Sequence, residues 1–161
     1  ALYLGIMVDT KNFVFKTGTR TFEAAAYLKR MGADTISVKQ MTQSDIKDFV
    51  TRAEIIKSAQ IYKENIAIAK TSDVDSVIVA QAADELLNIS GIEASFVLTE
   101  SPQGVNISGR SLGNINVQMI LERLGGGGHM TVAGAQIENE SINTVFEKLK
   151  EAIDDYFTQS Q

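Results

Sequence analysis

The sequence predicts an α/β fold in which helices pack on a mixed β-sheet. Three observations favour this class: short apolar runs typical of buried strands, amphipathic stretches between them with a repeat near 3.6 residues, and turn residues where the repeat changes. Of the 161 residues, 44% are hydrophobic, which is enough for a sizeable core. No apolar run approaches the ~18 residues of a membrane-spanning helix and no signal peptide is recognisable, so we expect a soluble chain without a membrane segment.

The first forty residues predict short elements. We expect, in order, a buried strand or the last turns of a helix over 2–8, a strand over 13–15, a helix from Thr19 or Thr21 to about Met31, and a strand over 35–39. Gly32 is the expected stop of the helix. The apolar run at 2–8 leads directly into Asp9, and Thr10 to Asn12 then form a turn.

A longer helix is expected next. The stretch 42–45, Thr-Gln-Ser-Asp, is a plausible capping box, and apolar residues follow at helical spacing from Ile46 to Ile56. This helix can run to about Tyr62 and contains neither glycine nor proline. We interpret it as a stiff connector between two domains.

The remainder predicts one complete domain with alternating elements. We expect strands over 66–69, 92–98, 105–108 and about 133–137, and helices over 74–88, 116–124 and 141–157. Asn116 is the expected N-cap of the second of these helices. The predicted organisation is therefore residues 1–41 as the tail of one domain, 42–63 as the connecting helix, and 64–161 as a second domain.

Four successive glycines, 125–128, precede His129, the only histidine. Glycine is costly to order, so a folded domain uses such a run where the backbone turns sharply or approaches something closely. Without Cβ atoms, successive N–H groups can converge on an anion, with His129 at the rim as a donor. A flexible linker or a tight turn against protein is the alternative interpretation.

A second candidate is the run Ser-Gly-Arg-Ser at 108–111, which leaves a predicted strand. The Arg110 guanidinium, flanked by two hydroxyls, can offer a bidentate fork to a phosphate, although an exposed turn arginine would look the same. Arg110 and His129 lie on either side of one predicted short helix, so both can face a single phosphate. Asp9 alone fits a metal ligand, a helix cap or a turn residue.

Several function classes are disfavoured. A net charge of −5 argues against a broad duplex-DNA footprint. No lysine follows the glycines as in a nucleotide triphosphatase loop, and a single histidine with no evident nucleophile spacing does not indicate a catalytic triad. The absence of cysteine removes disulfides and thiolate metal sites.

The glycine–histidine run, the Arg110 motif before it and the helix between them closely resemble the DHH-associated domain, the substrate-binding half of the DHH phosphoesterases. The segment from Leu4 to Phe13 resembles the last motif of the catalytic DHH domain. Within the family, the sequence from Asn106 to the glycines is most similar to that of membrane-anchored cyclic-di-AMP phosphodiesterases of Gram-positive bacteria.

The resemblance implies two-metal hydrolysis of a cyclic dinucleotide or a short oligonucleotide, with two Mn²⁺ ions. It implies Asp9 as one metal ligand. It also implies a group of substrate-phosphate-binding residues: Arg110, Ser111, Gly126, Gly127, Gly128 and His129. Because the Asp-His-His signature is absent, we expect the 161-residue chain alone to be inactive, and the parent protein to be active on the cytosolic side of the membrane.

Other interpretations stay open. Oligoribonucleases and single-strand exonucleases belong to the same superfamily, and the C-terminal domain of alanyl-tRNA synthetases, an RNA-binding module, resembles the same glycine-rich unit. A dimerisation or scaffold domain, in which the glycines form a tight turn sealed against protein, is a third class. The sequence leaves open a homodimer.

Overall fold

The structure is a computed structural model that describes residues 1–159. The chain forms two compact units, the first spanning Ala1–Asp45 and the second beginning at Ile46. The division falls where the helix expected as a connector begins. Within residues 1–159 no helix combines the length and the apolar character needed to cross a membrane.

The first unit consists of three helices, α1 (Leu2–Asp9), α2 (Thr19–Arg30) and α3 (Thr35–Met41). Residues 2–8 are therefore helical. The helix predicted from Thr19 is confirmed, and Gly32 follows it with φ +92°. The predicted strand over 13–15 is wrong, because these residues form turns.

The predicted strand over 35–39 is also wrong. Asp34 caps α3 instead, and its carboxylate accepts hydrogen bonds from the backbone N–H groups of Ile36 at 3.0 Å and Ser37 at 3.3 Å. Such an N-cap satisfies helix donors that a strand would not present. Ile36, within this segment, is 68% exposed.

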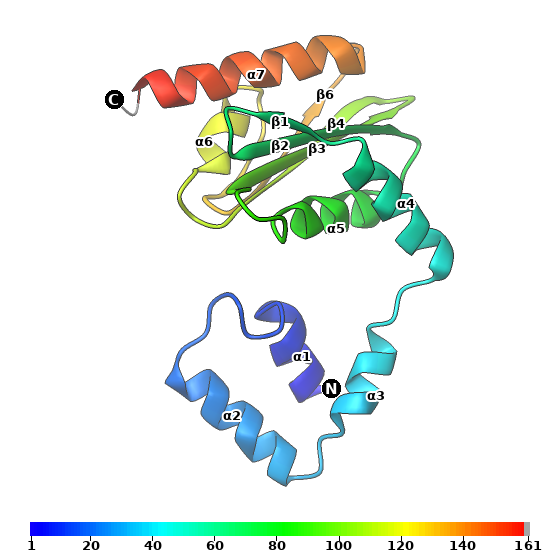
Figure 1. The fold of residues 1–161 in the computed structure, drawn as a ribbon, viewed down its shortest axis with the longest axis vertical. Coiled ribbons are helices and arrows are strands. Elements are labelled where there is room, and N and C mark those ends of the chain that lie inside the picture. Colours follow the sequence, from blue (N-terminus) through cyan, green and yellow to red (C-terminus); the bar gives the residue numbers. More distant parts are fainter. Residues whose placement is uncertain (160–161) are drawn as a thin grey trace. The chain divides into compact units, whose positions relative to one another are not determined.

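Over residues 46–159, the second unit is one mixed sheet with four helices (Figure 1). Its elements are α4 (Ile46–Lys57), β1 (Gln60–Tyr62), β2 (Ile66–Ser72), α5 (Ser76–Leu86), β3 (Ala94–Ser101), β4 (Gly104–Ser111), α6 (Val117–Glu122), β5 (Gly127–His129), β6 (Val132–Ile137) and α7 (Ile142–Gln159). The strand order is β1-β2-β3-β4-β6-β5, with β2 and β3 parallel and the other pairs antiparallel. The α/β class is thus confirmed.

Two details differ from the sequence-based expectation. Helix α4 ends at Lys57, and residues 60–62, expected as its last turn, form the edge strand β1. A short strand, β5, begins within the glycine run and ends at His129. Asn116 is the N-cap of α6 as predicted, because its Oδ1 accepts a hydrogen bond from the Met119 N–H at 3.2 Å.

Helices cover the two faces of the sheet unequally. Helices α6 and α7 pack across one face, where the core includes side chains from β2, β3, β4 and β6 (Figure 1). Helices α4 and α5 pack on the other face, where the buried strand residues belong to β2 and β3 alone: Ala67, Ala69 and Val97. On this second face, the apolar core therefore does not extend over β4, β6 and β5.

A candidate phosphate-binding face on strands β4, β6 and β5

Arg110 and His129 lie in one row across three neighbouring strands. Arg110 on β4 is the register partner of Val132 on β6, and Val132 is also the partner of His129 on β5. Side chains of register partners leave an antiparallel sheet on the same side. Arg110, Val132 and His129 therefore share one face, and two strand spacings place the Cα atoms of Arg110 and His129 roughly 10 Å apart.

Buried and half-buried residues alternate along β4, and this alternation determines which side chains lie on the face of Arg110. Val105, Ile107, Gly109 and Ser111 are buried toward α6 and α7, whereas Asn106, Ser108 and Arg110 are half-buried on the face of α5. Gly109 fits this packing because a Cβ atom there would lie 3.1 Å from both Leu121 and Phe96 side-chain atoms. The close contact of α6 with β4 thus fixes which residues of β4 face the other way.

The Arg110 side chain is held in place by two interactions. Its Nε lies 3.1 Å from Oδ1 of Asp84 on α5, and its Nη1 donates to the Gly109 carbonyl oxygen at 2.9 Å. The side chain is 13% exposed. Because a guanidinium keeps its charge at all ordinary pH values, this arrangement presents an oriented cation at the border of solvent.

His129 is exposed on β5, which is an edge strand of the described sheet. An edge strand has backbone N–H and C=O groups on one side without a strand partner. Gly127 lies on the same face as His129, since its register partner Gly134 is two residues from Val132. The imidazole and the backbone of β5 are therefore accessible to a ligand beside Arg110.

The four glycines serve different purposes. A Cβ atom at Gly126 would overlap the Gly134 carbonyl oxygen, and one at Gly128, where φ is +145°, would lie 2.5 Å from the Val132 carbonyl oxygen. Both glycines thus allow β5 to approach β6 closely. A Cβ atom at Gly127 meets nothing within 4 Å, so this position is open.

The glycine run does not form a cradle of four free N–H groups. The N–H groups of Gly125 and Gly126 donate to the carbonyl oxygens of Glu122 at 3.1 Å and Leu121 at 2.9 Å. At Gly126 and Gly128 the backbone therefore packs tightly against protein, as the tight-turn interpretation expects. At Gly127 and His129 there is open space through which an anion can approach.

Ser111 does not share the face of Arg110 and His129. Ser111 is 2% exposed on the opposite face of the sheet, and its Oγ accepts a hydrogen bond from the Gly113 N–H at 2.9 Å. Asp9 ends α1 in the first unit. Within residues 1–159 no group of three or more His, Cys, Asp or Glu residues is placed to hold a metal ion. The described residues alone therefore do not supply a manganese site.

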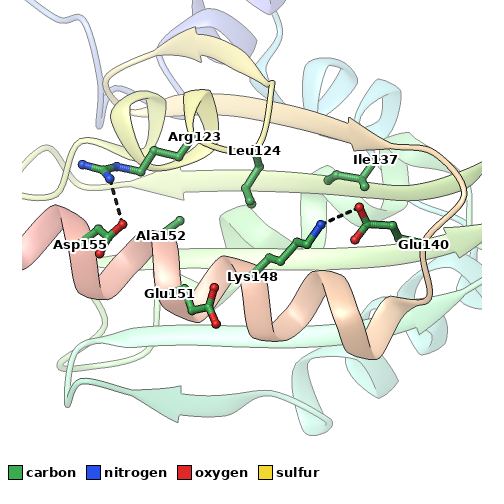
Figure 2. Close-up of a pocket in the computed structure, with 8 residues that line it drawn as sticks. All are labelled: Arg123, Leu124, Ile137, Glu140, Lys148, Glu151, Ala152 and Asp155. Carbon is green, nitrogen blue, oxygen red and sulfur yellow. Dashed lines mark hydrogen bonds and ion pairs between the residues drawn. The ribbon is translucent and has the colours of Figure 1, made fainter.

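A cavity of about 430 Å³ lies on the other face of the sheet, between α7 and the ends of α6 and β6 (Figure 2). Two cations and three carboxylates line it: Arg123 lies 3.1 Å from Asp155, Lys148 lies 2.6 Å from Glu140, and Glu151 is the third carboxylate. Carboxylates outnumber cations in this lining, so its net charge opposes the approach of a phosphate. The face of Arg110, where the single carboxylate of Asp84 is balanced by the guanidinium and His129 adds an imidazole, is therefore the better candidate for an anion site.

Residues 63–159 match the family model of the DHHA1 domain. The chain belongs to the DHHA1 domain family. It is 49% identical to the cyclic-di-AMP phosphodiesterase GdpP of Geobacillus thermodenitrificans over 98% of its length, and it spans 24% of that protein. The predicted resemblance to the DHH phosphoesterases is thereby confirmed.

Two solved structures share the fold. An exopolyphosphatase-related protein from Bacteroides fragilis matches 94% of this chain and 48% of its own chain, with a TM-score of 0.84 and 18% identity. RecJ from Thermus thermophilus in complex with Mn²⁺ matches 98% of this chain and 23% of its own, with a TM-score of 0.54 and 12% identity. At these identities the likeness concerns the fold.

Proposed function

We propose that this chain is the substrate-binding part of a manganese-dependent cyclic-di-AMP phosphodiesterase. It binds a phosphate of the dinucleotide between Arg110 and His129. The observation that carries the proposal is the Arg110–Val132–His129 row, which presents a fixed cation and an exposed imidazole on one face of the sheet. The 49% identity to a cyclic-di-AMP phosphodiesterase supports the choice of ligand.

The row suits an anion for physical reasons. A guanidinium donates two parallel hydrogen bonds to phosphate oxygens, and an imidazole adds a third donor from the opposite side. Gly127, which carries no side chain and has open space beside it, lets a ligand approach the backbone of β5. The other glycines and Ser111 act indirectly in this proposal, because they shape β5 and the end of β4.

Asp9 is proposed as one carboxylate ligand of the manganese centre, with the remaining ligands supplied by another part of a longer protein. The length of the relative, of which this chain spans 24%, supports this division. RecJ, which shares the fold and was solved in complex with Mg²⁺ and with Mn²⁺, supports a divalent metal ion. We expect the 161-residue chain alone to bind nucleotide without hydrolysing it, and manganese-dependent hydrolysis by this chain would contradict that.

Calorimetry of the 161-residue chain with cyclic-di-AMP and with linear di-adenylate tests the phosphate site. Loss of a charged hydrogen bond in Arg110→Ala or His129→Ala should weaken binding by about 2 kcal/mol, roughly thirtyfold. Arg123→Ala is the matched control, because this arginine lies on the opposite face. Equal affinity of Arg110→Ala, His129→Ala and the unaltered chain would remove both residues from the site.

A further inference from the structure

A strip of polar side chains continues from the Arg110–Val132–His129 row along β4 and β6. This polar strip consists of Asn106 and Ser108 on β4 and Gln136 on β6. Asn106 and Gln136 are register partners, and Ser108 is the partner of Gly134. Alternate residues of a strand point to the same face, so the polar strip shares the face of Arg110.

Fold stability does not account for these side chains. Asn106 and Ser108 are half-buried, and within residues 1–159 neither they nor Gln136 forms a side-chain hydrogen bond. Thr99, in the same row as Asn106, is 4% exposed, and its hydroxyl also has no partner among the described residues. A buried polar group without a partner, such as the Thr99 hydroxyl, costs free energy. The side chains of Asn106, Ser108 and Gln136 reach solvent, so their donors and acceptors are available to a ligand.

The position of the amide pair indicates which part of a ligand it contacts. Asn106 is four residues from Arg110, which is about 13 Å along an extended strand. This distance is too long for one phosphate to contact both. A nucleotide held by its phosphate at Arg110 extends its sugar and base away from that anchor, and the polar strip runs in one such direction.

Amide side chains offer a donor and an acceptor side by side, and Asn or Gln pairs in this way with N6 and N7 of adenine. We propose that Asn106 and Gln136 form a subsite that reads an adenine base of the bound nucleotide. Ser108 lies between this subsite and the phosphate. The inference rests on the proposed function for its ligand, and it assigns base selectivity to residues outside the glycine–histidine motif.

Nuclear magnetic resonance of the 161-residue chain separates the two proposals. Adenosine 5′-monophosphate should shift the Arg110 Nε–H signal and the side-chain amide signals of Asn106 and Gln136. Ribose 5-phosphate, which lacks the base, should shift the Arg110 signal alone. Unmoved amide signals would overturn the base subsite whatever Arg110 does. Amide shifts without an Arg110 response would overturn the phosphate site and keep the base subsite.

Variants give a second test. Asn106→Ala and Gln136→Ala should each reduce the preference for linear di-adenylate over linear di-uridylate roughly tenfold, with affinity for ribose 5-phosphate unchanged. Gln60→Ala is the matched control, an exposed glutamine at the opposite edge of the sheet. An unchanged preference in both variants, or an equal loss for both dinucleotides, would overturn the inference.

Discussion

The guanidinium of Arg110 on β4 and the carboxylate of Asp84 on α5 form an ion pair, with 3.1 Å between Nε and Oδ1. Their side chains are 13% and 32% exposed, so the pair lies at the border of solvent. The carboxylate has two opposing effects on an anion site. It orients the guanidinium, and its negative charge repels an approaching phosphate.

We expect Asp84→Asn to strengthen phosphate binding. The amide oxygen of asparagine can still accept from Arg110 Nε, whereas the removed charge no longer opposes the ligand. At the dielectric of a partly exposed site, this is worth about 0.5–1 kcal/mol, a few-fold in affinity. Titration with linear di-adenylate at low and high salt measures it. Glu151→Gln, on α7, is the control, and weaker binding by Asp84→Asn would show that orientation by the charge dominates.

The glycines should separate by substitution. Gly127→Ala should leave the free energy of unfolding unchanged or raise it by about 0.5 kcal/mol, because its Cβ meets nothing within 4 Å. Gly128→Ala should lower it by about 2 kcal/mol or more, since φ is +145° and the Val132 carbonyl oxygen is 2.5 Å away. Urea unfolding measures both. Similar losses in the two variants would contradict the different roles assigned to these glycines.

Arg52 links α4 to α5 and should matter for stability. It is 5% exposed, and its Nε donates to Glu85 at 2.7 Å and its Nη1 to Gln81 at 3.0 Å. We expect Arg52→Met to lower the free energy of unfolding by about 1–3 kcal/mol, less than for a fully buried pair because Glu85 can hydrate. Arg30→Met, at the exposed end of α2, is the control for urea unfolding. An equal effect of the two changes would argue against a stabilising role for the Arg52 contacts.

Tyr62 and Asp154 predict how stability depends on pH. Burial, assisted by the hydrogen bond to Asp154 at 2.8 Å, raises the pKa of Tyr62 to about 12. The unfolded chain loses this proton near pH 10 and the folded chain near pH 12, so the stabilisation is full below pH 10 and is lost between these values. In Tyr62→Phe, the urea concentration at the unfolding midpoint should fall less between pH 10 and pH 12 than in the unaltered chain. Tyr27 is exposed, so Tyr27→Phe should show the same fall as the unaltered chain.

At acid pH, stability should change in the opposite direction, falling as the pH falls. The hydrogen bond from Lys63, followed by that from Tyr62, lowers the pKa of Asp154. The resulting stabilisation is present above the unfolded value of about 4 and is lost as pH falls through the lowered pKa. Asp154→Asn should therefore reduce stability at pH 7 and lessen the further loss on acidification. An unchanged acid limb in unfolding experiments would exclude this contribution.

Much of the second unit was predictable because its sequence signals agree with its packing. The β2 and β3 runs are apolar and are buried on both faces, and Asn116 caps α6 as its residue type suggests. The first unit was harder to predict. Among residues 1–45, Thr10 and Ala25 are the buried ones, so Ile36 and Val38 were not held on a core face, and the capping side chain of Asp34 decides the local structure.

The candidate site was partly predictable. Arg110 and His129 were identified from their motifs, and the structure places them on one face. They share a row only because residues 127–129 form strand β5. This strand was hard to predict, because it has three residues and glycine is uncommon in strands. The side chain of Ser111 follows the alternation of β4 to the other face. Asp84, Asn106 and Gln136 carry no motif, although the alternation of polar residues along β4 could have indicated the polar strip.

Because β4 and β5 both pair with β6, hydrogen-bonded backbone sets the separation of Arg110 from His129. Replacing side chains at positions 106, 132 or 136 leaves that separation intact. In the proposed site, substitution of Asn106 or Gln136 can therefore change the preferred base while the spacing between the two phosphate-binding side chains stays the same. Selectivity and anchoring are in this sense separately heritable properties of one small sheet.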